Sequence, residues 1–307
     1  MASENTSWKH SPERGNLLGI KILVWTCCVF GRKAVHSLLL FITLFFVIFA
    51  AKPRAHSKSY LQRIYKIQTG FFKTFKHFYW FARTSVDRVF FLKGQLNKFE
   101  ISFEGDEIFK HLNPSQGALL LLSHIGNFDA LRALKHQKVD QPVRVVLDSN
   151  INPNAMQALN AINQAFADDI IDRSQFGGPG LALKIEEEIS KGAMVGIMAD
   201  RIYDHEPSIK QAFLGSTAEF PLGPWQLALL LKAPVILCFG IYLGANRYRL
   251  KFVSLPEIQA HKRAERSFIM ESLCKRYVAE MENILNAHPL NWFNFYDFWK
   301  SNPAKHH

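Results

Sequence analysis

The chain has 307 residues, of which 48% are hydrophobic and 21% charged, and its formal net charge is +11. This composition supplies a substantial hydrophobic core and excludes an intrinsically disordered chain. Residues 1–100 hold 16 Lys and Arg against 4 Asp and Glu, whereas residues 101–307 hold 21 against 22. A basic N-terminal third favours an anionic partner, either a bilayer surface or a nucleic acid.

Two apolar runs within the basic region favour the bilayer. Residues 17–30 are interrupted by Lys21, and residues 38–51 read LLLFITLFFVIFAA without any charge. Extended back to Val35, the second run has about 17 residues, the lower limit for a helix that crosses a bilayer. A tilted or half-inserted helical pair fits equally well, and the flanking Lys and Arg give no orientation. We expect a retained membrane anchor over residues 1–55.

Residues 56–98 alternate aromatic and cationic side chains, as in GFFKTFKHFYWFARTSVDRVFF. Lys73, Lys76, Arg83 and Arg88 have the spacing of a basic stripe along a helix. The pattern predicts basic aromatic amphipathic helices that lie at a membrane interface. A helix that packs its Phe residues into a protein core and exposes its Lys residues is the alternative, and the two can coexist.

Several familiar fingerprints are missing from the sequence. The four Cys residues include an adjacent pair and no CxxC spacing, which indicates neither a disulfide framework nor a zinc site and favours a reducing cytoplasmic setting. There is no GxxxxGK[ST] loop, no GxGxxG after a strand and no GxSxG elbow. Nucleotide binding and serine hydrolase chemistry are therefore disfavoured.

From residue 99 onward, short β-rich runs alternate with helical ones, which predicts an α/β fold with a mixed, largely parallel sheet covered by helices. The sequence shows no second domain boundary, so the predicted organisation is an anchor (1–55), amphipathic helices (56–98) and one α/β domain (99–307). The predicted strands are 99–104, 118–122, 143–147, 169–171, 194–198, 234–240 and 248–253. The predicted helices are 106–112, 128–136, 153–166, 179–190, 222–231 and about 261–286.

The segment SHIGNFDALRAL, residues 123–134, carries the candidate catalytic pair. His124 precedes Asp129 by five positions, a spacing that suits a general base and the carboxylate that orients it. The spacing alone is expected about once by chance in this composition. Its position raises its weight, because it follows a predicted buried strand where Gly126 and Asn127 predict a turn and a helix cap. A capping and core-packing pair is the alternative.

Four blocks extend the pattern in order along the chain. They are HIGNFD at 124–129, IIDRS at 170–174, GIMADR at 196–201 and FLGSTAEFPLGP at 213–224. With the apolar, basic N-terminus, this ordered set resembles the bacterial lipid A late acyltransferases and the wider glycerolipid and lysophospholipid acyltransferase superfamily. Asp129 stands where many of those enzymes have Glu, and Asp200-Arg201 where Asp-Gln is common. The ending NWFNFYDFW, with SPERGN and GR near the start, resembles the subgroup of aryl polyene and xanthomonadin-type pigment clusters.

The resemblance implies a membrane-bound O-acyltransferase at the cytoplasmic face of the bacterial inner membrane. It would move an acyl or aryl polyenoyl chain from an acyl carrier protein thioester, or from coenzyme A, to a hydroxyl of a lipid acceptor. His124 would be the base, oriented by Asp129, and thioester chemistry calls for no metal or redox cofactor. A catalytically inactive lipid-binding member of the same fold is the alternative. A nucleic-acid-binding membrane protein, the other rival, is disfavoured.

Eight residues are candidates for substrate binding. Arg173 and Arg201 each follow an Asp at a predicted strand end, where they would grip a phosphate or carboxylate or would form structural pairs. The FLG turn and its neighbours would shape a loop over the acceptor or a plain hairpin. The C-terminal aromatics, Trp292 to Trp299, would wall an acyl tunnel, anchor the C-terminus or pack into the core. The eight candidates are Asn127, Arg173, Asp200, Arg201, Phe213, Gly215, Pro221 and Gly223.

Overall fold

The computed structural model describes residues 17–112, 115–137, 140–150, 169–202, 206–256 and 262–299. The strands there are β1 (Glu100–Glu104), β2 (Ala118–Gly126), β3 (Val143–Leu147), β4 (Ile170–Asp172), β5 (Met194–Met198), β6 (Ser208–Phe213), β7 (Ser216–Pro221), β8 (Val235–Gly244) and β9 (Arg247–Ser254). Within these residues, seven strands form one sheet in the order β1-β9-β8-β2-β5-β3-β4. β9 and β1 run opposite to the other five, which confirms the predicted mixed, largely parallel sheet.

The described helices are α1 (Leu17–Phe49), α2 (Ala51–Tyr65), α3 (Phe71–Leu92), α4 (Arg132–Gln137), α7 (Gly178–Ser190), α8 (Gly223–Leu230) and α9 (Arg266–Ala287). Two short 3₁₀ helices, η3 (Asp106–His111) and η4 (Phe128–Leu131), replace α-helical turns in the predicted helices 106–112 and 128–136. The predicted helix 153–166 lies outside the described residues. Every predicted strand has a counterpart, but β2 continues to Gly126 instead of ending at Leu122.

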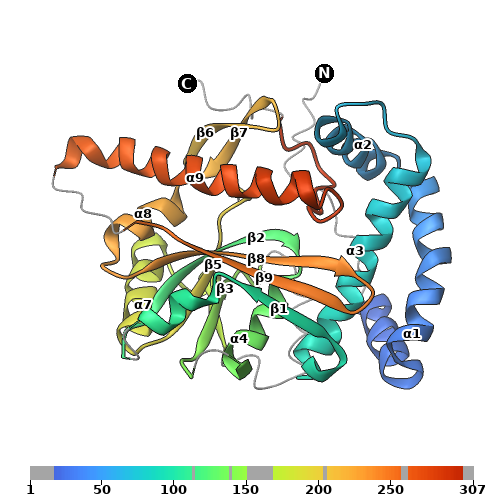
Figure 1. The fold of residues 1–307 in the computed structure, drawn as a ribbon, viewed down its shortest axis with the longest axis horizontal. Helices are drawn as coiled ribbons and strands as arrows, with labels where there is room; N and C mark the ends of the chain where they lie inside the picture. Colours follow the sequence, from blue (N-terminus) through green and yellow to red (C-terminus); the bar gives the residue numbers. More distant parts are fainter. Residues whose placement is uncertain are drawn as a thin grey trace.

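Alternate side chains of β2 enter two different cores, as the period of a strand requires. Leu119 and Leu121 pack with residues of α7, α8, α9 and the β6–β7 hairpin. Leu120 and Leu122 pack on the opposite face, with residues of α1, α3 and the η4–α4 segment. The sheet is therefore covered on both faces, and Figure 1 shows α9 running along one of them. Burial on both faces explains why residues 118–122 of β2 are an unbroken apolar run.

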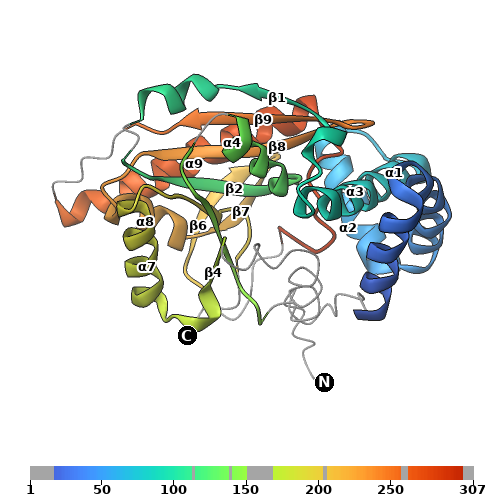
Figure 2. The same cartoon turned by 90° about the horizontal axis from the view of Figure 1, so that it is seen from below.

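Helix α1 carries the described segment that is long and apolar enough to cross a membrane. The segment spans Val29–Phe49, 21 residues with a mean hydropathy of 1.8. Phe41 and Phe45 are 72% and 57% exposed on it. At Gly31, a φ of 72° kinks the helix, a conformation that glycine adopts without steric cost. Figures 1 and 2 place α1, α2 and α3 together at the opposite end of the molecule from α7 and α8.

The basic aromatic segment forms α2 and α3, and the two ends of α3 differ in burial. Phe72, in its first turn, is 84% exposed, whereas Phe90 and Phe91 in its last turns are buried in the core. Of the predicted stripe of cations, Arg83 bonds a backbone carbonyl of the β8–β9 turn and Arg88 pairs with a carboxylate of the α/β domain. The C-terminal half of α3 is thus a core helix.

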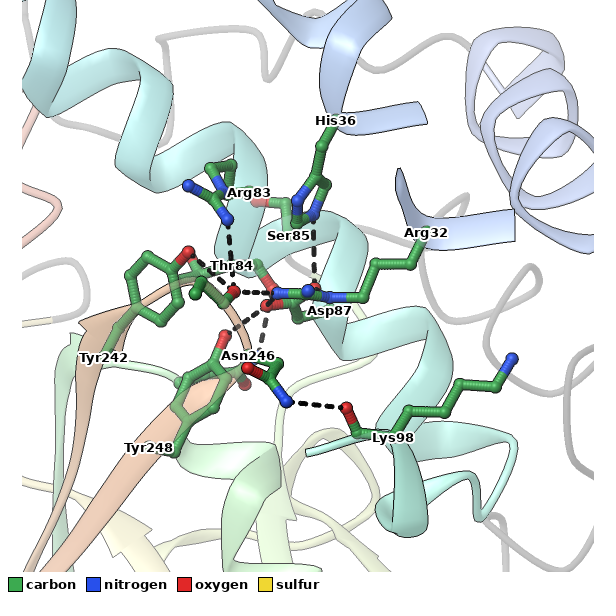
Figure 3. Close-up of polar contacts among 12 residues, drawn as sticks. Arg32, His36, Arg83, Thr84, Ser85, Asp87, Lys98, Tyr242, Asn246 and Tyr248 are labelled. Carbon is green, nitrogen blue, oxygen red and sulfur yellow. Dashed lines mark hydrogen bonds and ion pairs between the residues drawn. The ribbon is translucent and has the colours of Figure 1, made fainter. Parts of the chain in front are cut away.

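A buried polar cluster fixes α1 to the rest of the protein (Figure 3). The fully buried Asp87 of α3 accepts hydrogen bonds from Arg32 Nε and Nη2 at 2.5 and 2.8 Å. The Tyr248 hydroxyl of β9 donates to the same carboxylate at 2.8 Å, and His36 Nε2 lies 3.3 Å from it. Removal of one partner from such a buried pair leaves an uncompensated charge, so the cluster holds the apolar helix in one position against the sheet.

Candidate active site

The candidate site lies where β2 and β5 run side by side towards their carboxyl ends. Leu122 of β2 is in register with Met198 of β5. His124 and Asp200 each stand two residues further along the chain, so the paired strands deliver both side chains to the same edge of the sheet. Ligands of open α/β sheets bind outside the carboxyl ends of the strands. The geometry of β2 and β5 therefore places a histidine and a carboxylate in the region where such a fold holds its substrates.

His124 and Asp200 are joined by two hydrogen bonds. Nδ1 of His124 lies 2.8 Å from Oδ1 of Asp200, and the backbone N–H of His124 donates to Oδ2 at 3.0 Å. An ionised carboxylate only accepts, so Nδ1 carries the hydrogen and Nε2 keeps its lone pair. The side chain of Asp200 is 0% exposed, whereas that of His124 is 24% exposed. The arrangement is a fixed, partly accessible imidazole whose Nε2 carries the basic lone pair.

The charges around the pair keep it in the state that a general base needs. Burial, and then the charge of Arg201, lower the pKa of His124, although Asp200 opposes both. Burial alone would raise the pKa of Asp200, but His124 and Arg201 outweigh it and bring that pKa to about 2. At neutral pH, therefore, the imidazole is neutral and the carboxylate ionised.

Asp129 does not take the place expected for it beside His124. In the described part of the chain it pairs with Arg88 of α3, whose Nε lies 2.6 Å from its Oδ2, and more distantly with Arg132 at 3.9 Å. The carboxylate that contacts the imidazole belongs to Asp200, which the sequence suggested only as a substrate-binding residue. The physical reason is the β2–β5 pairing, which brings Asp200 to His124, whereas η4 carries Asp129 towards α3.

Asn127 has a structural position. Its side-chain oxygen accepts the backbone N–H of Asp129 at 3.1 Å, which confirms the predicted helix cap, and its side-chain nitrogen donates to the carbonyl of Thr84 on α3. Both polar groups of the amide are thus used inside the protein.

The two candidate arginines have different surroundings. Arg173 pairs with Glu206 and lies 3.8 Å from Asp148, so its interactions are those of a structural ion pair. Arg201 donates to the backbone carbonyl of Phe293 at 2.9 Å, and its charge acts on both members of the His124–Asp200 pair. Arg201, unlike Arg173, therefore belongs to the immediate surroundings of the site.

The FLGSTAEFPLGP block forms the end of β6, the turn and β7 of the β6–β7 hairpin, and the start of α8. Leu214 and Gly215 make its two-residue turn with φ values of 49° and 79°, the pattern of a type I′ hairpin turn. Phe213 is buried in an aromatic cluster with Trp292, and Pro221 and Gly223 lie at the end of β7 and the first residue of α8. The plain hairpin that the sequence left open is thus the local structure.

Two glycines allow the end of β2 to approach its neighbouring strand β8 closely. A Cβ on Gly126 would lie 2.0 Å from the carbonyl oxygen of Gly240, and a Cβ on Gly240 would lie 2.2 Å from the carbonyl oxygen of Asn127. Gly126 also has a φ of 60°. Its backbone N–H donates to the carbonyl of Asn291 at 2.7 Å. Gly126 therefore positions the end of β2.

Sequence reasoning missed two contributors to the site. Trp292, for which the sequence offers a tunnel wall, an anchor or a core position, is completely buried, and its indole N–H donates to Asp200. Arg88, which the sequence predicts only as part of a basic stripe along a helix, acts electrostatically on His124. No local spacing announces either contact, because both depend on how distant elements pack.

Comparison with known proteins places these elements in a family. A search of curated proteins gave no match to this chain. The family model described as bacterial lipid A biosynthesis acyltransferase matches residues 73–301, which include most of α3, the whole seven-stranded sheet and the His124–Asp200 pair. The matched part is well over half of the chain and indicates an enzyme that transfers an acyl group to a lipid. The chain belongs to the bacterial lipid A biosynthesis acyltransferase family.

Proposed function

We propose that the protein is a membrane-bound O-acyltransferase in which His124, oriented by Asp200, activates a hydroxyl of a lipid acceptor for attack on an acyl thioester. The observation that carries this proposal is the 2.8 Å contact between His124 Nδ1 and Asp200 Oδ1 at the carboxyl edge of the sheet. A hydroxyl is a weak nucleophile at neutral pH, so its attack needs a positioned base.

In the proposed reaction, the Nε2 lone pair of His124 accepts the proton of the acceptor hydroxyl as its oxygen attacks the thioester carbonyl carbon. The tetrahedral intermediate then collapses, the carbon–sulfur bond breaks, and the imidazolium returns its proton to the leaving thiolate. The products are an ester and a free thiol. Asp200 holds the Nδ1–H and stabilises the imidazolium between the two proton transfers.

Positive charge near the base supports the same chemistry. Arg201 and Arg88 both act electrostatically on His124. Besides keeping the imidazole neutral, these guanidinium groups create a positive potential where negative charge develops on the thioester oxygen. We therefore assign Arg201 and Arg88 to stabilisation of the oxyanion. The backbone N–H of Gly126 is not assigned this role, because it donates to the carbonyl of Asn291.

The position of the apolar helix supports a membrane location. The Arg32–Asp87 cluster fixes α1, with its exposed Phe41 and Phe45, against the domain that carries the site. A lipid acceptor in the bilayer and a soluble thioester donor then meet at one edge of the protein. We propose the cytoplasmic leaflet of the bacterial inner membrane, because both acyl carrier protein and coenzyme A thioesters are cytoplasmic.

The donor is proposed to be an acyl carrier protein thioester, with coenzyme A as the variant, and the chain transferred an acyl or aryl polyenoyl group. The test is mass spectrometry of total lipids from cells that express the wild-type chain or His124→Ala at equal abundance. A lipid species present only with the wild type would identify both the transferred chain and its acceptor. Identical lipid profiles from an expressed, membrane-bound protein would favour the inactive lipid-binding alternative.

A further inference from the structure

Trp292 lies in the segment after α9 and is locked against the strand that carries His124. Its backbone forms an antiparallel bridge with Ile125 of β2, and its side chain is completely buried. The preceding residue, Asn291, accepts the N–H of Gly126 through its carbonyl at 2.7 Å. Backbone contacts with Ile125 and Gly126, the two residues after His124, therefore hold the indole in place.

The indole N–H of Trp292 completes the set of donors around Asp200. It donates to Oδ2 at 3.2 Å, the same oxygen that accepts the backbone N–H of His124. Oδ1 is left for His124 Nδ1. With three donors on two oxygens, the carboxylate has one favoured rotation, and that rotation fixes the plane of the imidazole.

The main chain of Trp292 is in turn held by α2 and α3. His77 Nε2 lies 2.9 Å from the carbonyl oxygen of Trp292, and His77 Nδ1 lies 2.8 Å from the Ser57 hydroxyl. A carbonyl only accepts, so Nε2 carries the hydrogen and Ser57 donates to Nδ1. Burial lowers the pKa of His77 to about 4, which keeps this neutral tautomer at physiological pH. Tyr60 of α2 adds an edge-to-face contact with the indole, with ring centroids 5.2 Å apart.

We propose that Trp292 is a positioning residue for the reaction, which orients Asp200 through its indole N–H and thereby holds His124 in its productive tautomer and direction. The proposal rests on the proposed function. It also links α2 and α3, through the Ser57–His77 pair, to the catalytic base.

The effect of losing the indole N–H of Trp292 is predictable, because the titratable and charged groups that face His124 and Asp200 are known. Arg201 follows Asp200 on the chain, Arg88 faces His124 from α3, and Tyr277 of α9 faces Asp200 in its neutral form, since burial raises its pKa. None of these donors replaces the indole. Without it, Asp200 keeps more of its negative charge for the imidazolium, which raises the pKa of His124, and its rotation is less restricted.

The test compares Trp292→Phe with Trp225→Phe in the full-length protein reconstituted in vesicles. Trp225 is an equally buried indole whose N–H has no hydrogen-bond partner in the described part of the chain, so its substitution removes a ring nitrogen without removing a bond. We expect Trp292→Phe to lower kcat about tenfold, as loss of a hydrogen bond to a charged group predicts, with KM nearly unchanged. The acidic midpoint of kcat/KM should rise, whereas Trp225→Phe should leave both quantities at the wild-type values.

Equal losses of kcat in Trp292→Phe and Trp225→Phe, with an unchanged acidic midpoint of kcat/KM, would show that Trp292 has only a packing role. That result would overturn the proposal. If Trp292→Phe does not fold, benzothienylalanine at position 292 keeps the shape of the indole and replaces the N–H by sulfur. It should reproduce the shift in the midpoint, and wild-type behaviour of that protein would also overturn the proposal.

A titration of His124 separates this proposal from the proposed function. The His124 resonance in 13C-histidine-labelled protein is identified by its absence from His124→Ala, and its pKa is measured without any substrate. A higher pKa in Trp292→Phe than in the wild type supports the positioning role even if no acyl transfer is found. An unchanged pKa overturns it, whatever the fate of the proposed function.

Discussion

His124 and Asp200 are 76 positions apart in the chain, yet Nδ1 of one lies 2.8 Å from Oδ1 of the other. Their meeting follows from the parallel pairing of β2 with β5, in which Leu122 is opposite Met198. The pair has the arrangement of a base and its orienting carboxylate, and the predictions below depend on it.

Asp200→Asn removes the charge and presents an amide to His124 Nδ1. The imidazole then loses the partner that fixes its tautomer, so we expect kcat to fall by about 10²- to 10⁴-fold. The control is Asp172→Asn, because Asp172 also stands at the end of a strand and accepts the N–H groups of Ser149 and Ser174. A folded Asp200→Asn protein whose kcat stays within about tenfold of wild type would exclude the orienting role.

Activity should fall on acidification, because protonated His124 cannot accept the hydroxyl proton. Burial and the charge of Arg201 place the pKa of His124 below its ordinary value of 6.5. The plateau of kcat/KM should therefore extend from neutral pH to below 6.5, with a decline of one logarithmic unit per pH unit beneath the midpoint. The pH profile of kcat/KM, which reports the pKa values of the free enzyme, checks this prediction. A midpoint above 6.5 would contradict the assigned base.

Gly126→Ala should destabilise the protein and displace the end of β2, which carries His124. The new Cβ would lie 2.0 Å from the Gly240 carbonyl oxygen at a residue with φ near 60°. We expect the free energy of unfolding to fall by about 2 kcal/mol or more, since backbone strain adds to the clash. Gly178→Ala, whose Cβ meets no atom within 4 Å, is the control and should melt at the wild-type temperature. Equal melting temperatures for both variants would show that β2 and β8 do not approach each other this closely at Gly126.

The exposed face of α1 should anchor the protein in membranes. The double substitution Phe41→Glu and Phe45→Glu places two charges on one helical face, at a cost of about 2 to 3 kcal/mol each if the face lies in lipid. We expect much of the protein to leave the membrane fraction in sedimentation. Phe268→Glu, at a 75% exposed position on α9, should remain membrane-bound. If the double variant still sediments with the membrane fraction, other parts of the protein provide the anchor.

The fold was predictable because its central strands β2, β5 and β8 are buried on both faces. The run Met194–Met198 has the same bounds in the sequence prediction and in the structure, since Gly192 and Asp200 interrupt the apolar pattern on either side. The helix cap at Asn127 followed from local hydrogen-bonding rules in the same way.

The partner of His124 was not predictable from spacing. Asp129 is near in sequence, but the start of a helix turns it towards Arg88, whereas strand order decides which distant carboxylate arrives. The same holds for Arg32, which meets Asp87 of α3 across 55 positions. Contacts of this kind depend on tertiary packing, which a single sequence does not encode in any local period.

The most direct test is acyl transfer by purified protein in vesicles that contain a bacterial lipid extract, with an acyl carrier protein thioester as donor. The wild type should form an acylated lipid and release free carrier protein. His124→Ala should be slower by at least about 10²-fold while it stays folded and vesicle-bound. A His124→Ala protein with near-wild-type transfer rates would contradict the account.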